Sequence, residues 1–590
     1  MKNLKNVFIA AFALAIIGSC YKSKLNQPAP GELTAEEIAT KKGVDGLLIG
    51  AYSMLDGLGG SPAITYANST SNWIYGSICG SEAYKGSIQG DQQQITDAEI
   101  FIANANNIYF DSKWGGAYEG VQRANSVLRN MRLAKDMSTA DTIEAKAEAL
   151  FLRAFYHFEA KKMWNKIPFV DESVTYDAGN YHIVNSTTWV HIENDLIYAV
   201  NNLPRTQAAI GRANKYAAEA LLAKAYMFEN KFAQAKPLLA DLITNGETAG
   251  GSKYALDSQY NNNFNIQYKN SAESVFACQN SVNDGSGGSN GDQGDALNFP
   301  VNSPVTGCCG FFQPSQYLVN HFKTDPVTGL PDLDNFNEVA VHNDEGLQSS
   351  DPFTPYSGTL DPRLDWTVGR RGIPYLDWGV DPGFNWVRDQ SFSGPYLPIK
   401  NVYYQAQAAM YVDNDWNQLT AMNINLIRFA DVLLWAAEAE VEIGSLDQAE
   451  VYVNMIRKRA ANPAGFVHTY VDPSNPATGF TNTPAANYFI KPYPPGYFAT
   501  QGQTIARKAV RYERMLELAM EGHRFFDLVR WGIAATEINA YFLKEKNLRT
   551  YMNGAVFTPN KNEYFPIPQT EIDLSKGPSG IPAMTQNPGY

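Results

Sequence analysis

Two distant stretches of the sequence share one spacing of small and apolar residues, and this spacing limits the possible fold more than any other feature. The stretch KYAAEALLAKAYMFENKFAQAKPLLADLI is matched, much later, by ADVLLWAAEAEVEIGSLDQAEVYVNMIRKRA. Ala437 corresponds to Ala223, 214 positions earlier (437 − 223), and Ala449 corresponds to Ala235 at the same offset. Apolar residues three and four apart predict helices. Each stretch therefore predicts a pair of packed helices, and the first pair is divided near Asn230.

Helical pairs of this kind are similar to tetratricopeptide units, which bury their apolar faces by stacking on neighbours. A further long helix is predicted in DTIEAKAEALFLRAFYHFEAKKMW, where apolar residues recur at spacings of three and four from Ile143 to Phe158. The charged residues Glu144, Glu148 and Arg153 mostly fall on other faces. This pattern predicts an amphipathic helix with one buried side.

Between the two helical pairs, from about residue 245 to about residue 420, the helical periodicity fades. Gly, Pro, Asn and aromatic residues dominate this region instead. We therefore expect a mainly α fold, in which a helical scaffold at about 31–245 and 420–590 carries a long irregular insertion. Long structured loops on a rigid frame are where binding residues usually lie.

The N-terminus has the pattern of a bacterial lipoprotein signal. Two lysines precede an apolar run that is too short to cross a bilayer and that ends in the sequence IGSC at 17–20. This ending is similar to a lipobox, in which the cysteine sulfur becomes the lipid attachment point. We expect residues 1–19 to be a signal peptide, Cys20 to carry the lipid, and residues 20–30 to be a tether. An ordinary signal peptide that happens to end in cysteine is the alternative.

The composition of the chain argues against one class of partner and favours another. A net charge of −13 is unsuited to nucleic acid, because phosphate binding needs clustered Lys and Arg. The chain has 33 Tyr, 30 Phe and 10 Trp, more than a helical core alone requires. Tyr and Trp often work half-exposed at binding surfaces, so we expect a ligand that contacts aromatic rings.

Four cysteines remain after Cys20, and an exported chain can oxidise them. They allow three pairings. Our hypothesis is a disulfide between the adjacent Cys308 and Cys309, with a second, long-range disulfide between Cys79 and Cys278. Reduced and buried cysteines are the alternative.

Several motifs together resemble the SusD/RagB family of Bacteroidetes outer-membrane lipoproteins. They are the lipobox, EAKAEALFLRAFYHFEAKKMWNKIPFV, INLIRFADVLLWAAEAEVEIG, RYERMLELAMEGHRFFDLVRWG, and the ending YFPIPQTEID with TQNPGY. The resemblance runs from Cys20 to Tyr590 and implies a single SusD-like domain at 31–590, built from four tetratricopeptide units that bear a variable insertion.

The same resemblance implies a binding role without catalysis or a cofactor. Proteins of this family capture nutrients, in many cases oligosaccharides, as lids over a SusC-like, TonB-dependent outer-membrane barrel. We therefore expect an outer-membrane, lipid-anchored protein that faces the cell exterior, although the segment YKSKLNQ after Cys20 has no acidic residue of the kind that surface-export signals in this group often contain. The RagB branch implies an alternative, a peptide-capture or structural lid subunit that binds no sugar.

The segment EGHRFFD has the look of an active site, because Asp527 follows His523 at i+4 and Arg524 lies beside them. A zinc site needs further well-placed ligands, and the sequence contains no HExxH or paired CxxC motif. The resemblance places this segment in the scaffold. We interpret its charged residues, with Glu513 and Glu517 upstream, as ion pairs between packed helices.

The carboxylates of the sequence suggest two further kinds of site, a glycosidase site and a calcium site. A glycosidase needs two opposed carboxylates, and no pair stands out among 60 Asp and Glu. The run NDGSGGSNGDQGD contains Asp284, Asp292 and Asp295, which are suitable calcium ligands, but it does not match the twelve-residue calcium loop. We expect a flexible loop there, with calcium binding as a weaker alternative.

A sugar site needs flat aromatic rings for stacking and polar side chains for hydrogen bonds. The densest such mixture is DPRLDWTVGRRGIPYLDWGVDPGFNWVRDQ, and a second, TSNWIYGS, corresponds to an early segment in which SusD-like proteins place ligand contacts. The predicted ligand contacts are Asn72, Trp73, Tyr75, Arg371, Tyr375, Asp377, Trp378 and Trp386. The apolar face of the Cys308–Cys309 disulfide is a further candidate for the same pocket.

Overall fold

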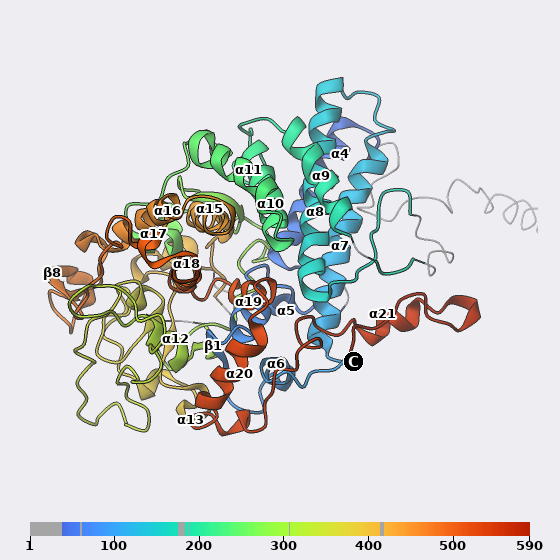
Figure 1. Ribbon diagram of the computed structural model, residues 1–590. Coiled ribbons are helices and arrows are strands. Elements are labelled where there is room, and N and C mark those ends of the chain that lie inside the picture. Colours follow the sequence, from blue (N-terminus) through green and yellow to red (C-terminus); the bar gives the residue numbers. More distant parts are fainter. Residues whose placement is uncertain (1–37, 60–61, 175–182, 187, 306, 414–417) are drawn as a thin grey trace, which may run out of the picture.

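Long helices follow one another along the first part of the chain and pack in the order in which they occur (Figure 1). The structure is a computed structural model that describes residues 38–59, 62–174, 183–186, 188–305, 307–413 and 418–590. The predicted signal peptide, Cys20 and the tether lie outside these ranges. The helices of this first group are α4 (Lys41–Tyr52), α7 (Ile108–Asn130), α8 (Thr139–Trp164), α9 (Trp189–Asn202), α10 (Lys215–Phe228) and α11 (Phe232–Asn245).

A second helical group continues the stack after the long insertion. Helix α11 packs against α15, although residues 246–428 separate them in the sequence. The main helices of this group are α15 (Phe429–Ile443), α16 (Leu446–Ala460), α18 (Gln503–Glu517), α19 (Arg524–Arg530) and α20 (Ala534–Glu545). The pairs α10/α11 and α15/α16 are the two predicted helical hairpins, and all four alanines that revealed them are buried. The predicted mainly helical, tetratricopeptide-like fold is confirmed.

Short elements fill the rest of the chain. The short helices are α5 (Thr65–Asn68), α6 (Gln93–Glu99), α12 (Gln316–His321), α13 (Gln390–Ser393), α14 (Ala408–Tyr411), α17 (Tyr497–Gln501) and α21 (Gln569–Leu574). The strands are β1 (Ala83–Gly86), β2 (Ser274–Cys278), β3 (Phe311–Pro314), β4 (Val368–Gly369), β5 (Leu397–Pro398), β6 (Ile424–Arg428), β7 (His468–Tyr470) and β8 (Phe480–Pro484). They form two-stranded antiparallel pairs, β1 with β3, β2 with β6, β4 with β5, and β7 with β8.

These pairs tie the insertion to the scaffold. Strand β2, near the start of the insertion, pairs with β6, which leads directly into α15. Strand β3, in the middle of the insertion, pairs with β1 near the N-terminus. Within the described residues, 53–59, 62–107 and 546–590 contain only short elements and loops.

Helix α8 corrects one prediction from the sequence. It is not amphipathic, because every residue from Ala147 to Trp164 is buried, whereas Ile143 on the expected apolar face is 38% exposed. The helix lies between α7 and α9, so its polar side chains face other helices instead of water. Arg153 is paired inside the protein with Asp195, at 2.7 Å.

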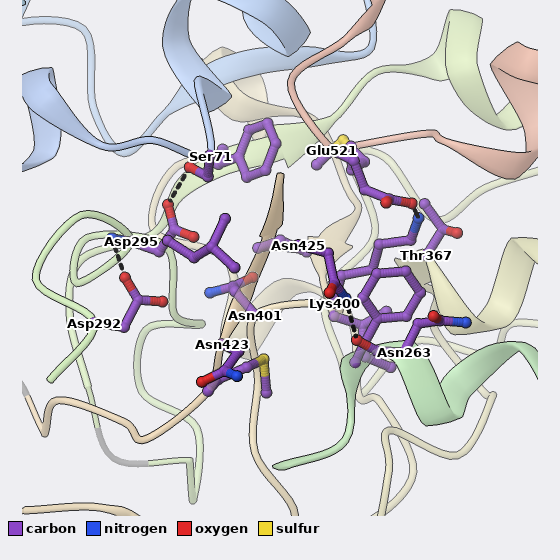
Figure 2. A pocket seen from close by; sticks show the side chains of 17 residues that line it. Ser71, Asn263, Asp292, Asp295, Thr367, Lys400, Asn401, Asn423, Asn425 and Glu521 are labelled. Atoms are coloured by element: carbon purple, nitrogen blue, oxygen red, sulfur yellow. Dashed lines mark hydrogen bonds and ion pairs between the residues drawn. The ribbon is translucent and has the colours of Figure 1, made fainter. Parts of the chain in front are cut away.

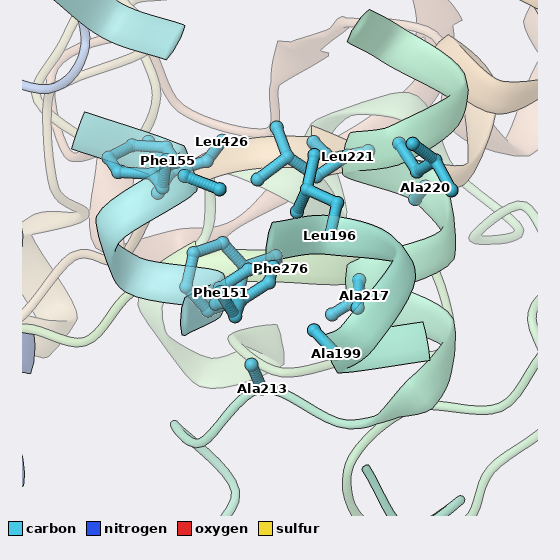
Figure 3. Close-up of a cluster of buried hydrophobic side chains, with 14 of the residues drawn as sticks. Phe151, Phe155, Leu196, Ala199, Ala213, Ala217, Ala220, Leu221, Phe276 and Leu426 are labelled. Atoms are coloured by element: carbon cyan, nitrogen blue, oxygen red, sulfur yellow. The ribbon is translucent and has the colours of Figure 1, made fainter. Parts of the chain in front are cut away.

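The largest hydrophobic cluster lies between the helices of the first group and strands β2 and β6 (Figure 3). Phe151 and Phe155 of α8 pack edge-to-face on Phe276 of β2, at ring-centroid distances of 4.9 and 6.2 Å. Each fully buried Phe of this kind contributes about 1.5–3 kcal/mol through removal of apolar surface from water. This cluster anchors the start of the insertion.

None of the described helices is both long and apolar enough to cross a membrane.

Candidate functional site

The early predicted ligand segment is part of the protein core. Trp73 and Tyr75 are each 1% exposed, within a π-helical turn, Trp73–Ile78. The Trp73 indole N–H donates to the Gly294 carbonyl at 3.1 Å, and the buried Asn72 amide donates to Glu159 at 3.0 Å. The prediction that these three residues contact ligand is corrected, because their side chains hold the protein's own segments together.

The second predicted segment, 371–386, also turns most of its aromatic residues inward. Tyr375 and Trp386 belong to a separate hydrophobic cluster inside the insertion, in which Tyr375 is 0% exposed. Arg371 is buried and donates to the carbonyls of Ser349 and Asp351. Burial removes these three from the candidate ligand contacts, because the insertion needs an apolar core of its own to be ordered.

Asp377 and Trp378 are half-buried and already engaged. The Asp377 carboxylate accepts from the backbone N–H groups of Gln405 and Ala406, at 2.6 and 2.9 Å. The Trp378 indole N–H donates to the Tyr403 carbonyl at 2.7 Å. Part of the Trp378 ring remains accessible, so it is the one aromatic residue of the predicted set that stays a candidate contact.

The four cysteines of the described ranges divide into one bonded pair and two buried thiols. Cys308 and Cys309 form a disulfide and are half-buried. Cys79 and Cys278 are free and buried in different hydrophobic clusters, so the predicted long-range disulfide between them is wrong. Each thiol is satisfied as a small apolar side chain in its own core.

The segment EGHRFFD is structural. Burial would raise the pKa of the Asp527 carboxyl, but Arg514 and Arg530 outweigh it and hold that pKa below its usual value. Burial lowers the pKa of His523 well below its usual value, so the imidazole is neutral. Within the described ranges, no group of three or more His, Cys, Asp or Glu side chains is placed to hold a metal ion.

The predicted ion pairs between packed helices are confirmed. Glu517 of α18 accepts from Arg363 at 2.9 Å and from Arg428 and Arg459 at 2.5 Å each. Glu513 pairs with Arg363 and Arg457 at 2.8 and 2.9 Å. All of these side chains are buried. They form one network that joins α16 and α18 to the insertion and to β6.

A cleft lies at the edge of this network, and its walls come from eight separate stretches of the chain (Figure 2). Its empty space, including the part open to solvent, is about 650 Å³. The lining residues are Ser71, Asn263, Phe264, Asp292, Asp295, Phe312, Thr367, Pro398, Ile399, Lys400, Asn401, Met422, Asn423, Ile424, Asn425, Met520 and Glu521. Of the eight predicted ligand contacts, none is among them.

The cleft combines amide side chains with aromatic rings. Four half-buried asparagines, Asn263, Asn401, Asn423 and Asn425, line it together with Phe264. Asn423 and Asn425 are occupied by hydrogen bonds to the protein. The side-chain oxygens of Asn263 and Asn401 accept no hydrogen bond from any residue that the structure describes, and both are accessible from the cleft. These oxygens are available to a ligand.

One wall of the cleft carries two carboxyl groups from the same loop. The Asp295 backbone N–H donates to the Asp292 carboxylate at 3.2 Å, and Asp295 accepts from the Ser71 hydroxyl at 2.7 Å. Burial raises the pKa of Asp292 well above its usual value, and the neighbouring Asp295 raises it further. Burial also raises the pKa of Asp295 to about 6, against hydrogen bonds from Ser71 and Ser69.

The opposite wall carries a buried ion pair, in which Lys400 and Glu521 neutralise each other's charge. Figure 2 shows Lys400 and Glu521 on the far side of the cleft from Asp292 and Asp295. The Lys400 ammonium lies 2.7 Å from Glu521, donates to the Ala519 carbonyl at 2.6 Å, and lies 4.3 Å from the Phe264 ring centroid. Arg428, which does not line the cleft, also pairs with Glu521, at 2.8 Å. The first residue of EGHRFFD therefore forms part of the cleft, although the segment is not catalytic.

The carboxylates weighed for calcium are separated by the fold. Asp284 is exposed and accepts hydrogen bonds from Ser281, Ser286 and Asn290 of its own loop. Asp292 and Asp295 face the cleft instead. The three do not form a common ligand set.

The cleft could not be recognised in the sequence, because its polar residues lie in short stretches without a motif. The clearer of two local signals was the alternation Asn423-Ile424-Asn425 at the start of β6, which places both amides on one side of the strand. The asparagine run at 261–263 was a second, weaker signal.

Comparisons with known proteins agree with this architecture. The sequence profile of the SusD family matches residues 272–590, and a second profile, described as starch-binding associating with outer membrane, matches residues 45–227. The chain is 24% identical over 510 residues to SusD-like protein P2 of Formosa agariphila, and the match covers 85% of each chain.

Two solved structures show the same fold. A SusD superfamily protein from Bacteroides vulgatus aligns with a TM-score of 0.65 at 22% identity, over 93% of this chain and 99% of that chain. Surface glycan-binding protein A from Bacteroides thetaiotaomicron, in complex with laminarihexaose, aligns with a TM-score of 0.64 at 20% identity, over 93% of this chain and 99% of that one.

Proposed function

The chain belongs to the SusD family, and we propose that it is a glycan-binding lipoprotein of the outer membrane that passes its ligand to a SusC-like, TonB-dependent barrel. The observation that carries this proposal is the cleft, in which accessible amide and carboxyl oxygens surround an aromatic ring. A similar protein of the same fold is described as a surface glycan-binding protein in complex with laminarihexaose.

The chemistry of the cleft suits a sugar. Sugars present apolar C–H faces and a rim of hydroxyl groups, so they need a ring for contact and side chains for hydrogen bonds. Phe264 supplies a ring, and its position beside the Lys400 ammonium keeps it fixed. Asn263, Asn401 and Asp295 supply acceptors for sugar hydroxyls. Asn263 and Phe264 lie on a short 3-10 helix, Tyr260–Phe264, whose Tyr260 hydroxyl donates to the Glu517 carbonyl, and Asp295 is held by the Ser71 hydroxyl. These contacts limit the motion of the site before the ligand binds.

We propose that the cleft binds without catalysis. Glycoside hydrolysis needs two carboxyl groups that flank the bond to be cut. Asp292 and Asp295 stand together on one wall and share a backbone hydrogen bond. Glu521, on the other wall, is ion-paired with Lys400 and Arg428, which hold its pKa below the usual value against the effect of burial. A carboxyl held ionised in this way is a poor general acid, and because both of its oxygens accept hydrogen bonds from Lys400 or Arg428, it is also a poor base or nucleophile.

We propose that Cys20 carries the lipid anchor and that the protein is exposed to the cell exterior. The support is the lipobox sequence at 17–20 and the family membership. A stable anchor requires more than one acyl chain, which lipidation of such a cysteine supplies. Labelling with palmitate, compared between the parent and Cys20→Ala, tests the anchor, and protease treatment of intact cells tests the exposure.

The binding proposal is tested with the chain produced from residue 21 onward, which retains every described residue. Isothermal titration against a panel of neutral hexasaccharides should find a binder, because the cleft is preformed. The double variant Asn263→Ala/Asn401→Ala should weaken binding at least about tenfold, since each lost hydrogen bond is worth about 1 kcal/mol. Asn385→Ala is the matched control, because this amide is exposed in the insertion but does not line the cleft.

The outcomes separate the alternatives. If no hexasaccharide binds, the glycan proposal is refuted, and binding of a peptide library in its place would favour the peptide-capture role. If a glycan binds and the double variant binds it equally well, the cleft is not the site. In that case Trp378→Ala tests the half-buried indole that the sequence analysis selected.

A further inference from the structure

The two walls of the cleft differ in charge balance, and this difference bears on which glycans can enter. Neither Asp292 nor Asp295 has a Lys or Arg partner within ion-pair distance in the part of the chain that the structure describes. Their neighbours are a backbone N–H and serine hydroxyls. One oxygen of Asp295 accepts no hydrogen bond from the described residues and is accessible from the cleft.

The positive charge in the cleft lining is not free to balance them. Among the described lining residues Lys400 is the one cation, and its ammonium is bound to Glu521 and to the Ala519 carbonyl. Its side chain is 7% exposed and packs over the rings of Tyr260 and Phe264. An acidic ligand would have to draw this ammonium away from a buried partner, which would leave Glu521 undercompensated.

The amide nitrogens of Asn263 and Asn401 each donate one N–H to a carbonyl of the protein and keep a second N–H. The side-chain oxygens of these two residues and one oxygen of Asp295 lack a donor and are acceptors. A sugar hydroxyl can donate to them. A carboxylate or sulfate group on a sugar has only acceptors, so it would face these oxygens without a hydrogen bond and with charge repulsion from Asp295.

We propose that the cleft selects uncharged glycans and rejects glycans that carry carboxylate or sulfate groups, with the carboxylate of Asp295 as the group that discriminates. The inference rests on the proposed glycan binding at the same cleft. The discrimination then comes from charge repulsion and unmatched acceptors that disfavour the wrong ligand, and not from extra contacts with the correct ligand. Disfavouring the wrong partner is a recognised route to specificity.

The test compares neutral and acidic hexasaccharides on the chain from residue 21 onward, at pH 7 and 0.15 M salt, with EDTA present. Laminarihexaose, maltohexaose and xylohexaose are the neutral probes, and hexagalacturonate and hexamannuronate are the acidic ones. The parent should bind at least one neutral probe at least about tenfold more tightly than either acidic probe. The double variant Asp292→Asn/Asp295→Asn keeps the shape of the wall, removes its charge and supplies donors, so the ratio should fall toward one.

Asp284→Asn is the matched control, because this carboxylate lies in the same loop but is exposed outside the cleft. It should leave the ratio unchanged. If the parent binds an acidic probe as tightly as a neutral probe, or more tightly, the inference is overturned and the glycan proposal survives. An unchanged affinity ratio in the double variant has the same consequence. If the parent binds no probe, both proposals fail. A repeat with 2 mM calcium (roughly the level of extracellular calcium sites) must leave the ratio in place, since calcium-dependent uronate binding would also refute the discrimination.

Discussion

Substitution of Gly522 by alanine tests how the segment EGHRFFD builds the cleft. Gly522 has a φ of +74°, in the left-handed region, and lies against the backbone of the early segment. A Cβ atom at this position would stand 1.9 Å from the Ser71 carbonyl oxygen. Real Cβ atoms do not approach closer than 3.0 Å, so one backbone must move by about 1.1 Å (3.0 − 1.9). Gly76 also packs closely against Gly522, because a Cβ atom added at Gly76 would stand 1.8 Å from the Gly522 carbonyl oxygen.

The expected magnitude has two parts. An alanine in the left-handed region costs about 1–2 kcal/mol, and forcing an atom into a packed interior costs about 1–3 kcal/mol. Gly522→Ala should therefore lower the free energy of unfolding by about 2–5 kcal/mol. Gly532→Ala separates the two parts, because Gly532 has a φ of +68° but no atom within 4 Å of an added Cβ. It should lose only the first part, about 1–2 kcal/mol.

Urea unfolding, followed by tryptophan fluorescence and circular dichroism, measures both variants against the parent. The comparison is valid where the slope with urea is unchanged, since the same surface is then exposed on unfolding. Ser71 and Glu521 line opposite sides of the cleft, so the displaced backbone should also weaken glycan binding in Gly522→Ala and not in Gly532→Ala. If the two variants are equally stable, the close backbone approach is not a stabilising constraint and the reasoning is refuted.

Three further predictions concern the buried charges and thiols. Glu517→Gln should lower the free energy of unfolding by about 3–5 kcal/mol, because three arginines lose a shared counter-charge in the interior; a loss below 1 kcal/mol in urea unfolding would contradict this. Asp295 has a pKa raised to about 6, so between about pH 4 and about pH 6 it holds a proton in the folded chain that the unfolded chain has released, and its contribution to stability should fall across that range. Asp295→Asn should reduce that fall by about 1–2 kcal/mol, and parallel pH profiles of parent and variant would refute it. In urea without reductant, only Cys79 and Cys278 of the chain from residue 21 onward should react with a thiol reagent; a count of zero or four would show a different pairing.

Local spacing was sufficient to predict the helical hairpins. The alanines at 223, 235, 437 and 449 are all buried within the packed pairs α10/α11 and α15/α16, as their spacing predicts. The spacing could not show what the polar side of a helix meets. In α8 the polar side chains Glu148 and Arg153 are buried and pair with Arg212 and Asp195 of neighbouring segments. The spacing of charged residues along a helix is the same whether these residues form ion pairs with a neighbouring segment or face water.

The aromatic residues show a second limit. Proline and glycine around Trp378 and Trp386 correctly predicted turns, but a turn does not determine which way the adjacent side chain points. That direction depends on whether the insertion needs the side chain for its own core, and Trp386 and Tyr375 are used in this way. The cleft was hidden for a related reason, because Ser71, Asn263, Asp295, Asn401 and Glu521 meet only after folding.

The segment EGHRFFD combines both lessons. A dense group of charged residues around a histidine indicates that the charges are paired, since ionised groups are buried only with partners. It does not indicate what the pairing is for. Here Asp527 and Arg530 hold α19 against α18 and α15, while Glu521 lies before the glycine turn and reaches the cleft. Because Glu521 shares Arg428 with Glu517, the binding wall and the buried network are one electrostatic unit. Loss of charge at Glu517 should therefore be felt at the cleft as well as in the core.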